Sequence, residues 1–222
     1  MEQRARQFTI LLIGGVSGVG KSETAAALSR LFGIPWLQVD DLRLALQFSG
    51  LVSREKHPEL FSFLDRSDWQ TPPETYRDKL IAVGQAITGA LRVVIESHVA
   101  TNVPVIIEGD GILPEFAATI AREYDERIIQ SVFIVEDDAD FLFANMLQRG
   151  RGIDPNAVPA LRRTEAHAKA LFSRWLAHEA GQYRLTTIRP LPWETLPERV
   201  IASCSDKDDV DSGRGGAYHT EN

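Results

Sequence analysis

Eight residues near the start of the chain match a phosphate-binding loop at every constrained position. Residues 15–22 read Gly-Val-Ser-Gly-Val-Gly-Lys-Ser, which fits the pattern G-x-x-x-x-G-K-[ST]. Glycines let the backbone wrap an anion and turn successive amide N–H groups toward it. The helix expected to begin at Lys21 points the positive end of its dipole at the same anion. A nucleotide phosphate site is therefore predicted from Gly15, Val16, Ser17, Gly18, Val19, Gly20, Lys21, Ser22 and Glu23.

The last two constrained positions of the motif carry the chemistry of phosphoryl transfer. Lys21 is expected to reach the β- and γ-phosphate oxygens of a nucleotide, and the Ser22 hydroxyl is expected to ligate magnesium. The motif therefore predicts a nucleoside triphosphate and Mg²⁺ as cofactors.

Two adjacent acids follow the second apolar segment of the chain, which covers residues 36–39. In a parallel sheet, ligands gather outside the carboxyl ends of the strands, so Asp40 should face the phosphate loop. Its carboxylate could accept the proton of an attacking hydroxyl and help to hold magnesium. Asp41 is the alternative catalytic carboxylate, and either acid could instead cap the next helix. Arg43, one helical turn later, could clamp an anionic acceptor.

A further acidic segment, Glu108-Gly-Asp-Gly, closes the third apolar segment. Glu108 is expected to contact magnesium through a water molecule. The predicted metal-site residues are therefore Ser22, Asp40 and Glu108. Asp110 is expected to contact the substrate, with glycines on both sides permitting a close approach. The alternative is an ordinary strand-to-helix turn built from turn residues.

An arginine-rich segment, Arg149-Gly-Arg-Gly, is predicted to form a lid at about 149–160. Kinases exclude water from the transferring phosphoryl group, and Arg149 and Arg151 would neutralise charge on closure. An arginine at a helix C-terminus also has a purely structural use. The adenine base is expected near this lid and Trp193.

Apolar runs alternate with helical periodicity along the chain, which is typical of an α/β sandwich with a mainly parallel sheet. Helices are predicted at 21–32, 42–48, 74–100, from 114, and at 139–148, 159–180 and 194–203, and strands at 8–13, 36–39, 103–107, 128–135 and 183–188.

Composition limits the class of protein. The 222 residues carry a formal net charge of −7, which argues against a nonspecific nucleic-acid clamp. Five acidic and two basic side chains fall in residues 203–222, so one domain at 1–203 and a disordered acidic tail at 204–222 are predicted.

Cys204 is the one cysteine of the sequence, which excludes an intrachain disulfide. No run of about 18 apolar residues is expected to cross a membrane, and a cytoplasmic location is predicted.

Three segments together resemble the 2-phosphoglycerate kinase-like group of P-loop kinases. They are residues 14–22, Val-Asp-Asp-Leu-Arg at 39–43 and Ile-Glu-Gly-Asp-Gly-Ile-Leu-Pro at 107–114. The family more usually has a hydrophobic residue and a histidine where Asp110 and Gly111 stand. The resemblance implies an ATP-dependent phosphotransferase on the nucleoside-monophosphate-kinase fold, a three-layer α/β sandwich whose five-stranded parallel sheet has the order 2-3-1-4-5.

These observations predict transfer of the γ-phosphoryl group of ATP to a hydroxyl or phosphate of a small, anionic metabolite. The segments Asn-Lys-x-Asp and Asp-x-x-Gly that mark GTP-binding switches are missing from the sequence. An antibiotic, a nucleotide sugar or a polynucleotide end is the alternative acceptor. A non-catalytic ATP-sensing regulator is the alternative from another class. The expected partner is a small-molecule acceptor, without nucleic acid or membrane, and no oligomeric state is predicted.

Overall fold

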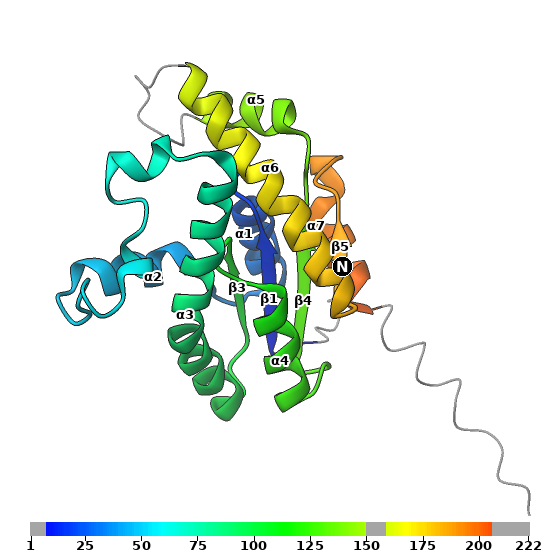
Figure 1. The fold of residues 1–222 in the computed structure, drawn as a ribbon. Helices are drawn as coiled ribbons and strands as arrows, with labels where there is room; N and C mark the ends of the chain where they lie inside the picture. Colours follow the sequence, from blue (N-terminus) through cyan, green and yellow to red (C-terminus); the bar gives the residue numbers. More distant parts are fainter. Residues whose placement is uncertain (1–7, 150–158, 206–222) are drawn as a thin grey trace, which may run out of the picture.

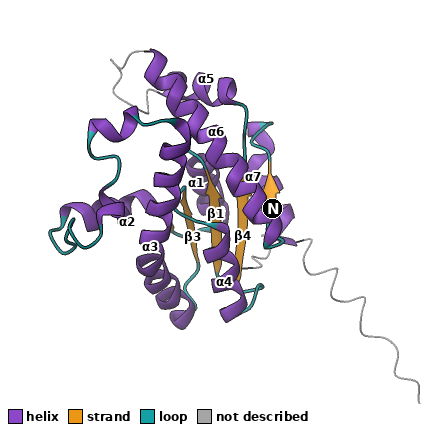
Figure 2. Cartoon of the chain, viewed as in Figure 1, coloured by secondary structure: helices purple, strands orange, loops and turns teal. Residues whose placement is uncertain are grey.

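The computed structural model of the protein describes residues 8–149 and 159–205. Its centre is a five-stranded sheet, drawn in orange in Figure 2. The strands are β1 (Ile10–Gly15), β2 (Trp36–Gln38), β3 (Val105–Gly109), β4 (Ile129–Ile134) and β5 (Thr186–Ile188). They are all parallel and follow the order β2-β3-β1-β4-β5, which confirms the predicted fold class. Every residue of β1, β3 and β4 is buried, because helices cover both faces of the sheet.

Helices form the two outer layers (Figure 1). Helices α1 and α7 pack on one face of the sheet, and α3, α4 and α6 pack together on the other. Helix α5 lies against α6, and α2 contacts β2, β3 and α3. The bounds are α1 (Lys21–Phe32), α2 (Val39–Phe48), α3 (Pro73–Thr101), α4 (Pro114–Tyr124), α5 (Ala139–Arg149), α6 (Pro159–Gln182) and α7 (Leu196–Ser205), with short 3₁₀ helices η1 (Pro58–Phe61), η2 (Arg66–Gln70) and η3 (Trp193–Thr195).

Local sequence explains why α1 occupies the predicted range. Gly20 and Gly33 flank the helix, and both adopt left-handed backbone conformations, with φ of 85° and 64°. The N–H of Gly33 donates to the carbonyl of Ser29, which satisfies one of the free carbonyls at the helix end.

Helix α2 differs from the prediction. It begins at Val39, directly after β2, so Asp40 and Asp41 lie in its first turn instead of in a loop before it. The N-cap residue is Gln38, with no side-chain cap hydrogen bond. The alternative capping role for Asp40 or Asp41 is therefore wrong. Their negative charges still favour this position, because they lie at the positive end of the helix dipole.

The C-terminal boundary lies slightly later than predicted. Helix α7 continues to Ser205, and the Cys204 side chain is buried in the core. The ordered domain therefore includes Cys204, which the sequence assigned to the tail. Residues 206–222, which make up the rest of the predicted tail, lie outside the described residues.

Helix α3 corrects the expectation that no stretch comes near a membrane span. By length and composition alone it could cross a membrane, and it is the one such helix in the described part of the chain. A core helix passes the same test. In this fold α3 packs against β1 and α6, with Ile87, Leu91 and Ile95 fully buried.

Candidate active site

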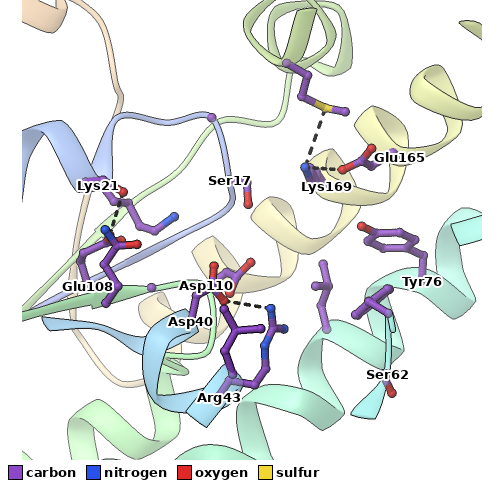
Figure 3. A pocket seen from close by; sticks show the side chains of 18 of the residues that line it. Ser17, Lys21, Asp40, Arg43, Ser62, Tyr76, Glu108, Asp110, Glu165 and Lys169 are labelled. Carbon is purple, nitrogen blue, oxygen red and sulfur yellow. Dashed lines mark hydrogen bonds and ion pairs between the residues drawn. The ribbon is translucent and has the colours of Figure 1, made fainter. Parts of the chain in front are cut away.

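A cavity of about 540 Å³ opens where β1, β2 and β3 end. Parallel pairing brings these ends together, since Ile13 of β1 and Gln38 of β2 both lie in register with Glu108 of β3. The predicted residues that line the cavity are Ser17, Gly18, Gly20, Lys21, Ser22, Asp40, Arg43, Glu108 and Asp110 (Figure 3). Three separate stretches of sequence are thus assembled at one site.

Two apolar residues of the phosphate loop anchor it in the hydrophobic core. The side chains of Val16 and Val19 are buried in the core, 1% and 0% exposed. From α5, the Asn145 Nδ2 donates a 3.1 Å hydrogen bond to the Gly18 carbonyl. A Cβ atom at Gly20 would lie 2.6 Å from the Trp193 ring, so only glycine fits there. Packing on both sides therefore fixes the loop backbone that faces the cavity.

Lys21 and Ser22, the last two constrained residues of the motif, each make a hydrogen bond beside the cavity. Lys21 is buried, and its ammonium donates a 2.9 Å hydrogen bond to the Val16 carbonyl. The Ser22 hydroxyl donates a 2.7 Å hydrogen bond to Oε1 of Glu108, which is also buried. The first turn of α1 and the end of β3 are thereby joined at the floor of the cavity.

The oxygen donors at this floor fit Mg²⁺. Ser22 and Glu108 offer hard oxygen atoms, as does Asp40, which lines the same cavity. Within the described ranges, no three His, Cys, Asp or Glu side chains form a metal-holding group. That is compatible with magnesium in phosphoryl-transfer sites, which uses one or two carboxylates and takes further ligands from phosphates and water.

The structure separates the two acids at the start of α2. Asp40 lines the cavity, whereas Asp41 is exposed and does not line it. The Asp40 carboxylate forms a 3.0 Å ion pair with the Arg43 guanidinium one turn later. The nearby Asp110 carboxylate, followed by burial, raises the pKa of Asp40 to about 6, against the opposing influence of Arg43 and Lys21. The carboxylate that faces the phosphate loop can therefore exchange a proton close to neutral pH.

The glycines beside Asp110 have a use besides the one predicted. A Cβ atom at Gly109 would lie 2.5 Å from the Cβ of Val39, and one at Gly111 would lie 3.0 Å from the Val39 Cγ1. Their missing side chains make room for the first residue of α2. Gly109 also lines the cavity, so the predicted close approach of a substrate beside Asp110 stays a prediction. The two glycines set how closely Asp40 approaches β3.

Several cavity residues were not singled out from the sequence. They are Gln47 of α2, Tyr76 of α3, and Glu165 and Lys169 of α6. All four side chains are buried and carry a polar group. An i,i+4 Glu–Lys pair on a long helix normally indicates a solvated face, so the sequence carries no signal that separates this pair from a surface pair.

The segment between α2 and α3 forms one wall of the cavity. Phe63 has φ of 69°, which is unusual for a bulky residue, and its N–H donates a 2.8 Å hydrogen bond to Asp68. Asp68 also accepts a hydrogen bond from Lys79 of α3. The Phe63 ring packs on Tyr76 with ring centroids 4.7 Å apart. These contacts tie the wall to α3.

A second cavity, of about 310 Å³, lies beside the same loop. Gly20, Glu23 and Trp193 line it, together with Thr24, Asn145, Gln148, Leu196 and Pro197. The Trp193 ring stacks on Phe141 with centroids 5.9 Å apart and an angle of 22° between the rings. The predicted location of a base near Trp193 thus coincides with a cavity that begins at the phosphate loop.

The predicted lid falls largely outside the described residues. Helix α5 ends at Arg149, whose side chain is not described, and Arg151 lies in the gap at 150–158. The roles of Arg149, Arg151 and the lid at 149–160 stay predictions.

Two known proteins are similar to this chain, one in sequence and one in fold. A 2-phosphoglycerate kinase from Methanothermobacter thermautotrophicus is 28% identical over 233 aligned residues, covering 99% of this chain and 72% of the relative. A gluconokinase from Sinorhizobium meliloti superposes with a TM-score of 0.50 at 15% identity, covering 96% of this chain and 100% of the other. The chain has the fold of a P-loop kinase. No protein-family model matches it.

In this fold, residues of the phosphate loop, of the segment at 39–43 and of the segment at 107–114 line one cavity. The resemblance to the 2-phosphoglycerate kinase-like group is confirmed, because the relative at 28% identity is itself named a 2-phosphoglycerate kinase. The predicted class, an ATP-dependent phosphotransferase, agrees with the relative at 28% identity, which is a kinase by name.

Proposed function

We propose that the chain is a magnesium- and ATP-dependent phosphotransferase that moves the γ-phosphoryl group of ATP to a hydroxyl group of a small metabolite. The observation that carries this proposal is the pairing of a phosphate loop and a carboxylate in one cavity. Lys21 lies on the loop side, and Asp40 lies opposite it with its pKa raised to about 6, chiefly by Asp110. A kinase needs both groups, one for the phosphate and one for the attacking hydroxyl.

The nucleotide would occupy both cavities. Its base would enter the smaller one and stack on Trp193, while its phosphates would follow the loop into the larger one. The Lys21 ammonium, which rests on the Val16 carbonyl, would exchange that weak acceptor for phosphate oxygens.

The acceptor would lie on the other side of the transferred group. The Asp40 carboxylate accepts the proton of the acceptor hydroxyl as its oxygen attacks the γ-phosphorus. The new O–P bond forms as the bond from phosphorus to the bridging oxygen of ADP breaks, so ADP leaves with that electron pair. Arg43 pairs with Asp40 and offers further N–H donors to an anionic group of the acceptor.

Magnesium would be held by Ser22 and Glu108, with Asp40 close by in the same cavity. When bound, the ion neutralises negative charge on the phosphate oxygens. The residues of the chain then have to position the acceptor, move its proton and exclude water. A cytoplasmic location and the absence of nucleic-acid and membrane partners stay predictions.

A coupled assay of ADP release tests the proposal. The acceptor panel includes 2-phosphoglycerate, because of the curated relative, together with hydroxy acids, polyols, an aminoglycoside and nucleotide sugars. Lys21→Ala and Asp40→Asn should each abolish acceptor-stimulated ADP release, whereas the exposed control Asp41→Asn should retain it. If ATP binds tightly but no acceptor stimulates turnover, and Asp40→Asn behaves like the parent, the ATP-sensing regulator replaces the kinase proposal.

A further inference from the structure

The lining of the larger cavity also includes four buried side chains with polar groups that the proposed transfer does not use. We call this set the distal end, and its residues are Gln47, Tyr76, Glu165 and Lys169. They come from α2, α3 and α6, and Figure 3 shows the Tyr76 hydroxyl directed toward Glu165 across the space between α3 and α6. None of these side chains has a part in the proton or phosphoryl transfer described above.

A buried ion pair forms one side of the distal end. The Lys169 ammonium lies 2.6 Å from Oε1 of Glu165, and the two side chains are 8% and 1% exposed. The other acceptor near the ammonium is the Met146 sulfur at 3.8 Å, a weak one. Removing two charges from bulk water is costly, and apolar residues usually stabilise a fold as well or better. A pair in a cavity wall is therefore better explained by a ligand than by stability.

Gln47 provides a separate observation. Its Nε2 donates to the Leu60 carbonyl, which fixes the orientation of the amide, because a carbonyl can only accept. Its Oε1 is buried and has no hydrogen-bond partner among the described residues. The Gln47 side chain is only 8% exposed, yet it lines the cavity. Such an acceptor lacks the donor that buried polar atoms normally have, and a ligand hydroxyl can supply one.

Tyr76 connects the distal end to the reacting end. Burial, and then the carboxylates of Glu165 and Asp110, raise the pKa of Tyr76 well above its usual range, against the opposing influence of Arg43. The hydroxyl is therefore neutral at physiological pH and can both donate and accept. One of these two carboxylates, Glu165, belongs to the distal end, and the other, Asp110, lies near Asp40. Tyr76 is therefore influenced by charges at both ends of the cavity.

Resting on the proposed function, we propose that the distal end binds hydroxyl groups of the acceptor, and that the acceptor is a small polyhydroxylated carboxylic acid. The phosphorylated hydroxyl lies at Asp40, the acid group at Arg43, and further hydroxyls lie between Glu165, Lys169 and Gln47. A hydroxyl donates to the carboxylate or amide oxygen and accepts from the ammonium at once. The dianion of a phosphate monoester has no donor for Gln47 or Glu165, and its charge opposes that of Glu165.

Calorimetric titration without nucleotide tests the distal end independently of catalysis. The probes are D-gluconate, which carries hydroxyls along its chain, and hexanoate, which has the same carboxylate and chain length without them. Gluconate should bind at least tenfold more tightly than hexanoate. The double variant Glu165→Gln/Lys169→Met, which leaves no unpaired buried charge, should weaken gluconate binding about 10- to 100-fold and leave hexanoate unchanged. Arg174→Met, exposed on the same helix, is the control.

A steady-state assay then separates the two proposals. In the double variant the KM for the hydroxy acid should rise, while the KM for ATP stays within twofold and thermal melting confirms folding. If gluconate binds no better than hexanoate, or the double variant binds it as the parent does, the distal end does not recognise hydroxyls, even where another acceptor is phosphorylated. If hydroxyl recognition is found but no acceptor is phosphorylated, the inference about the distal end stands and the kinase proposal falls.

Discussion

The Ser22 hydroxyl donates a 2.7 Å hydrogen bond to Oε1 of Glu108, linking the helix that follows the phosphate loop to the end of β3. Two residues separated by 86 positions in sequence thus meet at the floor of the cavity. In the proposed enzyme both would turn toward magnesium. The hydrogen bond shows that the serine and carboxylate already lie close enough to serve one ion.

Glu108→Gln should weaken the response to magnesium. The amide keeps the shape of the carboxylate but loses its charge, and removal of such a group commonly costs 10- to 100-fold in metal affinity. The Mg²⁺ concentration for half-maximal ADP release should rise by about that factor. Glu115→Gln, an exposed change in α4, should leave the value unchanged. An unchanged magnesium response in Glu108→Gln would remove Glu108 from the metal site.

Activity should rise with pH through the pKa of Asp40. The base must be ionised, and Asp110, as the largest influence, raises the pKa of Asp40 to about 6. The acid limb of a kcat/KM profile should therefore have its midpoint near that pH. Asp110→Asn removes the neighbouring charge, so the limb should move to lower pH. If the midpoint of the acid limb is the same in Asp110→Asn as in the parent, Asp110 does not control the pKa of Asp40.

Asp40→Asn should stabilise the fold while it removes activity. A pKa raised from 3.8 to about 6 means that the protonated folded state is favoured at low pH and that this contribution is lost as pH rises through about 6. The neutral Asn side chain avoids that loss. The variant should therefore gain more in Tm, relative to the parent, at pH 8 than at pH 4.5. An equal gain at both pH values would contradict this account.

Trp193→Ala should impair nucleotide binding selectively. The ring lines the smaller cavity and stacks on Phe141, and loss of an aromatic contact costs about 0.5–1.5 kcal/mol. The KM for ATP should rise about 2- to 10-fold, while the KM for the acceptor stays constant. Trp193→Phe, which retains a ring, should recover most of the affinity. A rise in the acceptor KM alone would place the base elsewhere.

Asp68→Ala should loosen the acceptor wall. Burial opposes ionisation of Asp68, but hydrogen bonds from Lys79 and Phe63 outweigh it and lower the pKa. This stabilisation is present above pH 3.8 and is lost as pH falls below that value. The substitution should cost about 1–3 kcal/mol in the free energy of unfolding and raise the acceptor KM.

The matched control for this change is Asp65→Ala in the same segment. Asp65 forms an exposed pair with Arg54, and such pairs contribute about 0–1 kcal/mol. Equal losses of unfolding free energy in the two variants would mean that Asp68 does not anchor Phe63.

Local rules predicted most of the fold. The apolar run at 8–13 and the glycines around α1 indicate a buried strand and a helix with little dependence on the rest of the chain, and both were found within two residues. The start of α2 was missed because Val39 is an apolar residue that continues the strand pattern. Its helical conformation depends on packing against Gly109, which local sequence does not reveal.

The residues of the site likewise fall into two groups, those that local rules predict and those that depend on tertiary packing. The placement of Lys21, Ser22, Asp40 and Glu108 in one cavity followed from a motif and from the rule that parallel strands end at one edge. The distal end could not be found this way. The burial of Glu165 and Lys169 is a tertiary property, created when α6 packs against α3 and α5.

Gly20 lines both cavities, and among the residues that form them it alone belongs to each. The one residue that the two linings share thus contributes backbone and no side chain. A bisubstrate inhibitor, with a purine in one compartment and a sugar acid in the other, would need a slender linker at this point. Its selectivity would come from Trp193 and Lys169, because the backbone amides of a phosphate loop offer the same contacts in many other proteins.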